Sequence, residues 1–143
     1  MTANVTTLLG FDYGARRIGV AIGNRIAHTA RALAVVANGA QGPDWKQVDT
    51  LVREWRPELL IVGLPLTLDD GEQHNSRAAR AFSEAIAARY SLPVELVDER
   101  SSSREAAKRF AARRASGAAK RKQAAALDAV AAEIIVERWL ETA

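Results

Sequence analysis

Two groups of acidic residues lie at the ends of apolar runs that predict β-strands. Asp12 has a glycine two residues away on each side, Gly10 and Gly14. Glycines let a ligand or another backbone segment approach closely. Asp98 and Glu99 follow a second apolar run. Because ligands of open α/β sheets gather beyond the carboxyl ends of parallel strands, this pair stands where a ligand is expected.

A third acid, Asp128, lies inside a predicted helix that is rich in alanine and isoleucine. Aspartate has poor helix propensity, and this one is close to the predicted buried stripe of the helix. The small neighbours Ala124, Ala125 and Ala132 would let the helix lie close to the sheet. In that case Asp128 points towards the strand ends that carry the other acids.

The acids at the two strand ends also have structural explanations. Asp12 can form a turn through its own side chain. Asp98 and Glu99 can complement the dipole of a following helix, although Ser102 already offers the N-cap there. Carboxylates that converge from distant parts of a chain repel one another unless a cation binds them. The combination therefore favours a functional site over a structural role.

The donor types indicate which cation such a site would hold. Carboxylates without a histidine pair or thiolates form a hard, oxygen-lined site, which suits Mg²⁺ or Mn²⁺ rather than zinc. Two such ions about 3.5–4 Å apart can activate a water molecule and stabilise the leaving oxygen during phosphodiester cleavage. The candidate metal ligands are Asp12, Asp98, Glu99 and Asp128.

Basic charge is concentrated in one segment of the chain. The formal net charge is +3, yet residues 100–122 carry nine basic residues against one acid, Glu105, and the remainder carries 11 basic and 16 acidic residues. This imbalance predicts a polyanionic partner, with a solvated helix face as the alternative. The expected nucleic-acid contacts in this segment are Arg100, Arg104, Lys108, Arg109, Arg113, Arg114, Lys120, Arg121 and Lys122.

Arg16 and Arg17 form a smaller basic group directly after the Asp12 turn. Guanidinium groups bind phosphate through charge-assisted hydrogen bonds, so both arginines are candidate contacts for a phosphate beside the metal. The alternative is that a turn exposes arginines in any case.

Hydrophobic periodicity predicts the elements that must hold these residues. Apolar runs at 7–12, 18–23 and 32–37 are joined by segments too short for a helix, and they predict a meander of antiparallel strands. The continuous apolar run 59–62 predicts a parallel strand that is buried on both faces. Two helices come next: one has a capping box formed by Asp44 and Gln47, and the other is ended by Leu92-Pro93. The remaining elements are a strand at 94–97, a basic helix from Ser102 to Gly117, and a final helix from about Gln123.

Together these elements predict an α/β fold with one domain over residues 1–143. Its mixed five-stranded sheet has three antiparallel and then two parallel strands, with helices on both faces. The chain length suits a single domain with a real core. Residues 115–122 are expected to be mobile.

Composition excludes several classes of protein. The chain has no cysteine, which rules out disulfides, a thiol nucleophile and a cysteine-ligated zinc or iron–sulfur site. No apolar run approaches the roughly 20 residues that cross a bilayer, and the first residues lack the layout of a signal peptide. We therefore expect a cytoplasmic protein without a membrane partner.

Three motifs resemble the YqgF/RuvX family. They are GFDYGARRIGVA at 10–21, IVGLPL at 61–66 and VDERSS at 97–102. The resemblance covers residues 8–139, and the order and spacing of the three motifs are specific. One departure is that residues 101–103 are all serine, without the usual leucine-threonine. We expect this change to affect helix packing more than catalysis.

This resemblance implies a ribonuclease H-like fold and a nuclease activity. It matches Asp12, Glu99 and Asp128 to the acidic, catalytic positions of the family, with Asp98 close by in the same motif. The family is assigned either to Holliday junction resolution or to processing of precursor 16S ribosomal RNA. We expect a Mg²⁺- or Mn²⁺-dependent endonuclease that acts on structured nucleic acid.

Precursor 16S ribosomal RNA ends are the favoured substrate over four-way DNA junctions. Symmetric cutting of a junction would want a two-fold dimer, and no exposed apolar stripe marks such an interface. The expected assembly is a monomer or a homodimer, with precursor ribosomal RNA or branched DNA as the partner.

Two other classes of function remain as alternatives. The segment from Asp12 to Val20 also looks like the first phosphate loop of the actin and sugar-kinase superfamily. Those proteins clamp a nucleotide between two such domains, however, and this chain supplies only one. The second alternative is a non-catalytic RNA-binding ribosome-maturation factor, in which the basic segment binds RNA and the acids are vestigial.

Overall fold

The computed structural model describes residues 5–64, 74–98, 108 and 123–142, without the side chains of 74–75 and 123–128. Its strands are β1 (Thr7–Tyr13), β2 (Arg17–Asn24), β3 (Thr29–Gly39), β4 (Gly42–Pro43), β5 (Leu59–Leu64) and β6 (Val94–Asp98). Its helices are α1 (Trp45–Trp55), α2 (His74–Tyr90) and α4 (Gln123–Thr142). None of the described helices is long and apolar enough to span a membrane.

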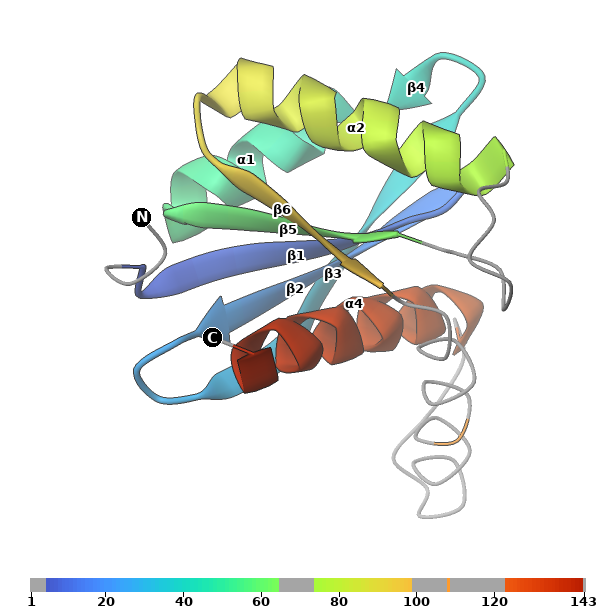
Figure 1. Cartoon of the computed structure of the whole chain (residues 1–143). Helices are drawn as coiled ribbons and strands as arrows, with labels where there is room; N and C mark the ends of the chain where they lie inside the picture. The colour runs from blue at the N-terminus through green and yellow to red at the C-terminus, as the bar shows by residue number, and fades with distance from the viewer. Residues whose placement is uncertain (1–4, 65–73, 99–107, 109–122, 143) are drawn as a thin grey trace.

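The strands form one mixed sheet in the order β4-β3-β2-β1-β5-β6. β1, β2 and β3 pair antiparallel, whereas β5 and β6 continue parallel to β1. Helices α1 and α2 cover one face and α4 covers the other (Figure 1). The predicted α/β class, the three antiparallel and two parallel strands and the helices on both faces are confirmed.

The sheet has one strand more than the five predicted. Gly42 has a φ of 92°, which glycine adopts freely, and the resulting tight turn folds Gly42 and Pro43 back onto the end of β3. Proline is tolerated there because β4 is an edge strand. The two-residue strand β4 is too short to give a periodic signal in the sequence.

The predicted capping box of α1 is half correct. Asp44 is the N-cap, and its side chain accepts from the Gln47 backbone N–H at 3.3 Å. The predicted reciprocal bond, from the Asp44 N–H to the Gln47 side chain, does not form. Instead the Gln47 side chain donates to the Val35 carbonyl at 3.2 Å, and the Asp44 N–H donates to the Ala37 carbonyl at 2.9 Å. These two hydrogen bonds connect the start of α1 to β3.

Side chains alternate between the two faces of the sheet along each strand, so the sheet separates two hydrophobic cores. Leu9 and Phe11 of β1 are fully buried in the core beneath α1 and α2. Leu8 is fully buried in the core beneath α4, and Gly10 lies against that helix. Since successive residues of a strand point to opposite faces, Asp12 belongs to the α4 face.

Helix α4 lies very close to the sheet because two strand residues lack side chains. A Cβ at Gly10 would overlap the Val136 side chain, and one at Gly23 would lie 2.5 Å from Val136 Cγ1. From the sequence, alanines of the helix were expected to let it approach the sheet closely. Ala132 does lie at this contact, but the sheet glycines provide the space for Val136.

A buried carboxylate fixes the same helix to β3. Glu133 is 9% exposed and accepts from the Ala32 N–H at 2.9 Å. Ala32 is beside a β-bulge, where the register with β2 shifts between Val20 and Ala21. An irregular strand leaves backbone groups without their usual ladder partners, and Glu133 satisfies one of them.

On the opposite face an exposed ion pair joins α1 to α2. Asp49 accepts from Arg89 Nε and Nη2, each at 2.8 Å, and from the Tyr90 hydroxyl at 2.5 Å. The Arg89 hydrogen bond, followed by that of Tyr90, holds the pKa of Asp49 well below its usual range. This stabilisation is present above the ordinary aspartate pKa of about 4 and is lost as the pH falls below it.

The glycine contact leads to a stability prediction. We expect Gly10→Ala to lower the free energy of unfolding by about 1–3 kcal/mol, because the new methyl group is forced against Val136. Combined with Val136→Ala, the change should cost less than the sum of the two single substitutions. Urea unfolding of the four proteins measures both effects.

Gly39→Ala is the matched control, because a Cβ at Gly39 meets nothing within 4 Å. A Gly10→Ala protein as stable as Gly39→Ala would mean that α4 does not depend on close contact with β1.

Candidate active site

Two of the candidate acids, Asp12 and Asp98, lie at the edge of the sheet where β1, β5 and β6 end. Asp12 is the penultimate residue of β1, and Asp98 is the last residue of β6. β5 lies between these strands, so their backbones are about 10 Å apart at the usual spacing of neighbouring strands. The structure thus brings Asp12 and Asp98 to one edge, as predicted, but not side by side.

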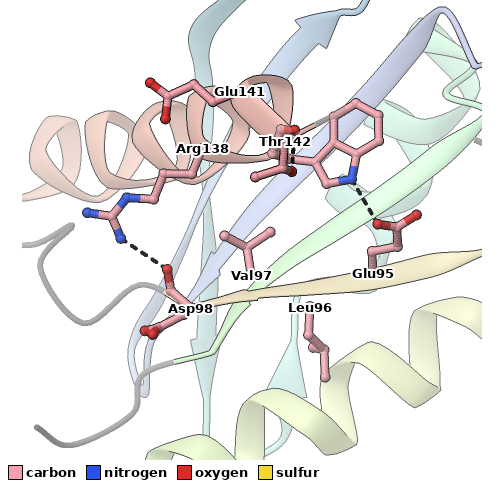
Figure 2. Close-up of a pocket in the computed structure, with 8 residues that line it drawn as sticks. Glu95, Leu96, Val97, Asp98, Arg138, Glu141 and Thr142 are labelled. Carbon is pink, nitrogen blue, oxygen red and sulfur yellow. Dashed lines mark hydrogen bonds between the residues drawn. The ribbon is translucent and has the colours of Figure 1, made fainter.

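Asp12 and Asp98 belong to opposite faces of the sheet. Val97 packs in the core beneath α4, and Glu95 accepts from Trp139 Nε1 of that helix at 2.9 Å. Leu96 points to the other side (Figure 2). By alternation Asp98 shares the side of Leu96, whereas Asp12 faces α4.

The turn after Asp12 is closely defined. The Gly14 N–H donates to the Arg17 carbonyl at 3.0 Å. A Cβ at Gly14 would lie 2.6 Å from that carbonyl oxygen, so the turn requires glycine. Arg16 and Arg17 are both exposed on it. Two exposed arginines therefore follow the half-buried Asp12 within five residues of the sequence, and their contact with a phosphate stays a prediction.

Asn38, at the end of β3, braces this turn from outside. Its Nδ2 donates to the Gly14 carbonyl at 2.7 Å, and its backbone N–H donates to the Arg16 carbonyl at 2.8 Å. Sequence reasoning missed Asn38. The only signal was an asparagine before Gly39 at a strand end, which is typical of turns but does not reveal a partner 24 residues away.

Position 128 lies on the same face of the sheet as Asp12. Helix α4 runs opposite to β1, since its C-terminal Trp139 and Leu140 share a core with Val5 before β1, and its Ala132 lies at Gly10. One helical turn from Ala132 to position 128 spans about 6 Å, and the two strand residues from Gly10 to Asp12 span about 7 Å. Position 128 of the backbone is therefore about level with Asp12.

Several predicted residues fall outside the described part of the chain. These are Glu99, the side chain of Asp128, the basic helix from Ser102 with its Arg100, Arg104, Arg109, Arg113, Arg114, Lys120, Arg121 and Lys122, and the segment 115–122. Lys108 is described and is exposed. Among the described residues, no group of three or more acidic or histidine side chains could hold a metal ion.

Comparison with protein families and curated proteins gives consistent matches. Residues 6–142 match the family RuvX, described as Holliday junction resolvase. The chain is 57% identical over 134 residues to a protein of Xanthomonas oryzae pv. oryzae (strain PXO99A) named "Putative pre-16S rRNA nuclease", which covers 94% of this chain and 86% of the relative. A protein of Xanthomonas campestris pv. campestris (strain B100) with the same name matches with the same identity and coverage.

Solved structures with the same fold are distant in sequence. One is Thermus thermophilus RuvC in complex with a Holliday junction substrate, with a TM-score of 0.56 and 19% identity over 96% of this chain and 94% of that chain. Another is the Fowlpox virus resolvase with Holliday junction DNA, with a TM-score of 0.59 and 11% identity over 96% and 98% of the two chains. These similarities support the ribonuclease H-like fold that the sequence predicts.

The brace at Asn38 can be tested without an activity assay. Asn38→Ala removes a hydrogen bond to the Gly14 carbonyl, so we expect local opening of the turn and amide exchange at Gly14 that is faster by about tenfold. Asn24→Ala is the matched control, because Asn24 Oδ1 accepts from the Ala27 N–H in the turn at the other end of the sheet. Hydrogen exchange followed by NMR measures both. Unchanged exchange at Gly14 in Asn38→Ala would contradict the brace.

Proposed function

The chain belongs to the RuvX family and is a nuclease, and on that premise we propose that it hydrolyses phosphodiester bonds in structured nucleic acid at a divalent metal site. The nuclease assignment replaces both alternatives considered for the sequence, the actin-type phosphate-binding domain and the non-catalytic RNA-binding factor.

The observation that carries this proposal is the placement of α4 against β1. Ala132 and Val136 lie at Gly10, so position 128 of the helix backbone is about level with Asp12 on the same sheet face. A strand and a helix far apart in sequence thereby supply one acidic residue each to a single region.

Strand parity argues against Asp98 as a partner of Asp12. Asp98 has the parity of Leu96, on the α2 face, whereas Glu95 and Val97 contact α4. Glu99 follows directly in the sequence and is the acid that the family resemblance matches to a catalytic position. We propose Asp12, Glu99 and Asp128 as the catalytic acids, with Asp98 in a secondary role.

The donor set suits a hard divalent cation. Asp12, Glu99 and Asp128 offer only carboxylate oxygens, which are the preferred ligands of Mg²⁺ and Mn²⁺. The bound metal would supply the charge that activates water and stabilises the leaving oxygen. Asp12 is held for this role by the glycine turn that follows it and by the Asn38 brace on that turn.

We propose that basic side chains bind the nucleic-acid backbone. Arg16 and Arg17 are exposed on the Asp12 turn, which favours contact with a phosphate next to the scissile bond. The basic residues of 100–122 would extend this contact along the substrate, with no element suited to reading bases. Binding of this kind recognises the shape of the backbone rather than its sequence.

Precursor 16S ribosomal RNA is the substrate that we propose, with the protein acting in the cytoplasm as a monomer or homodimer. The support is the name shared by relatives that are 57% identical over most of the chain. The family description favours a second candidate, the four-way DNA junction. Hydrolysis by an activated water does not require a 2′-hydroxyl, so the same acids can serve either substrate.

Isosteric variants of the acids test the proposed site. Asp12→Asn, Glu99→Gln and Asp128→Asn keep the side-chain shape but remove a ligand charge, so we expect each to abolish Mg²⁺- or Mn²⁺-dependent cleavage while the fold stays intact. Asp98→Asn should be milder. Cleavage of precursor 16S ribosomal RNA by purified proteins, with circular dichroism for the fold, provides the measurement.

Four-way DNA junctions in the same assay separate the two substrates. The proposal predicts RNA processing with little sequence preference. Paired, symmetric nicking of junctions without RNA processing would overturn the substrate but not the nuclease. An Asp12→Asn protein that cuts at the wild-type rate would remove Asp12 from the site, and a more damaging Asp98→Asn would reverse the choice between Asp98 and Glu99.

A further inference from the structure

We propose that Arg138 is a positioning residue for the metal site, an inference that rests on the proposed function. Arg138 lies on α4, ten residues after Asp128. Its Nη1 donates to the Asp98 backbone carbonyl at 3.0 Å. Figure 2 shows this side chain reaching from the helix to the end of β6.

The carbonyl that accepts from Arg138 directly precedes a proposed metal ligand in the sequence. The Asp98 carbonyl belongs to the planar peptide group that ends at the Glu99 Cα, because the peptide bond does not rotate freely. A donor that fixes this carbonyl restrains the backbone at Asp98, the residue directly before Glu99 in the sequence. Arg138 therefore acts on a proposed metal ligand through the backbone without being a ligand itself.

The end of β6 needs such a restraint. β6 is the outer strand of the described sheet and pairs only with β5, through a register that ends at Leu64 and Asp98. On the α4 side, Trp139 bonds Glu95, the second residue of the strand, and Arg138 bonds Asp98, its last residue. Two adjacent helix residues thus hold β6 at two points.

The direction of the Arg138 side chain matches this role. Helix side chains lean towards the N-terminus of their helix, and for α4 that is the end that carries Asp128. The half-buried Arg138 lines a groove of about 520 Å³ between β6 and the C-terminal part of α4, together with Asp98 and Glu141. Its rigid, permanently charged guanidinium can hold the carbonyl over this distance, which a shorter neutral side chain cannot do as well.

Metal affinity separates positioning from simple stabilisation. We expect Arg138→Gln to raise the Kd for Mn²⁺ about tenfold or more, which is the usual effect of losing an outer partner of a metal ligand. The Mg²⁺ concentration for half-maximal cleavage should rise in parallel, with most of kcat recovered at saturating Mg²⁺. Arg138→Lys keeps a cationic donor and should restore part of the affinity.

Glu141→Ala is the matched control, because Glu141 is an exposed residue of the same groove. Titrations of Mn²⁺ by electron paramagnetic resonance, with urea unfolding of each protein, provide the readouts. Wild-type Mn²⁺ affinity in Arg138→Gln, or an equal loss in Glu141→Ala, would overturn the role of Arg138 and leave the nuclease proposal standing. A wild-type protein that binds no Mn²⁺ would overturn both.

Discussion

Contact between α4 and the sheet at Gly10 and Gly23 determines where the other parts of the site lie. The methyl groups of Val136 occupy the space that side chains at these two positions would need. Glu133 ties the same helix to β3, and Trp139 ties it to β6. The helix is therefore fixed against strands on both sides of β1, and the level of position 128 relative to Asp12 follows from that docking.

Electrostatic repulsion is the cost of this arrangement. Acids that approach one another at the edge of a sheet destabilise the fold unless a cation or donors compensate their charge. Strand parity limits the repulsion, because it places Asp98 on the face opposite Asp12. The arginines on the turn after Asp12 add positive charge to the same part of the chain.

Local patterns in the sequence were sufficient for the fold. The fully buried strand β5, the N-cap Asp44 and the meander of β1 to β3 each follow from periodicity and turn chemistry within a few residues. Contacts between distant residues were not predictable in this way. Asn38 reaches Gly14, Gln47 reaches Val35, and Arg138 reaches Asp98 across 40 residues, and the partners are neighbours only after the sheet has formed. The sequence likewise did not show which residues of β6 face α4, because that depends on which helix covers each face of the sheet.

A crystal of the protein grown with Mn²⁺, examined by anomalous diffraction, would test most directly whether the docking of α4 forms the metal site. The account predicts an anomalous peak on the α4 face, with ligands from both Asp12 and Asp128. A Mn²⁺ ion bound by Asp98 on the α2 face without Asp12, or a crystal with no bound Mn²⁺ at this edge of the sheet, would contradict it.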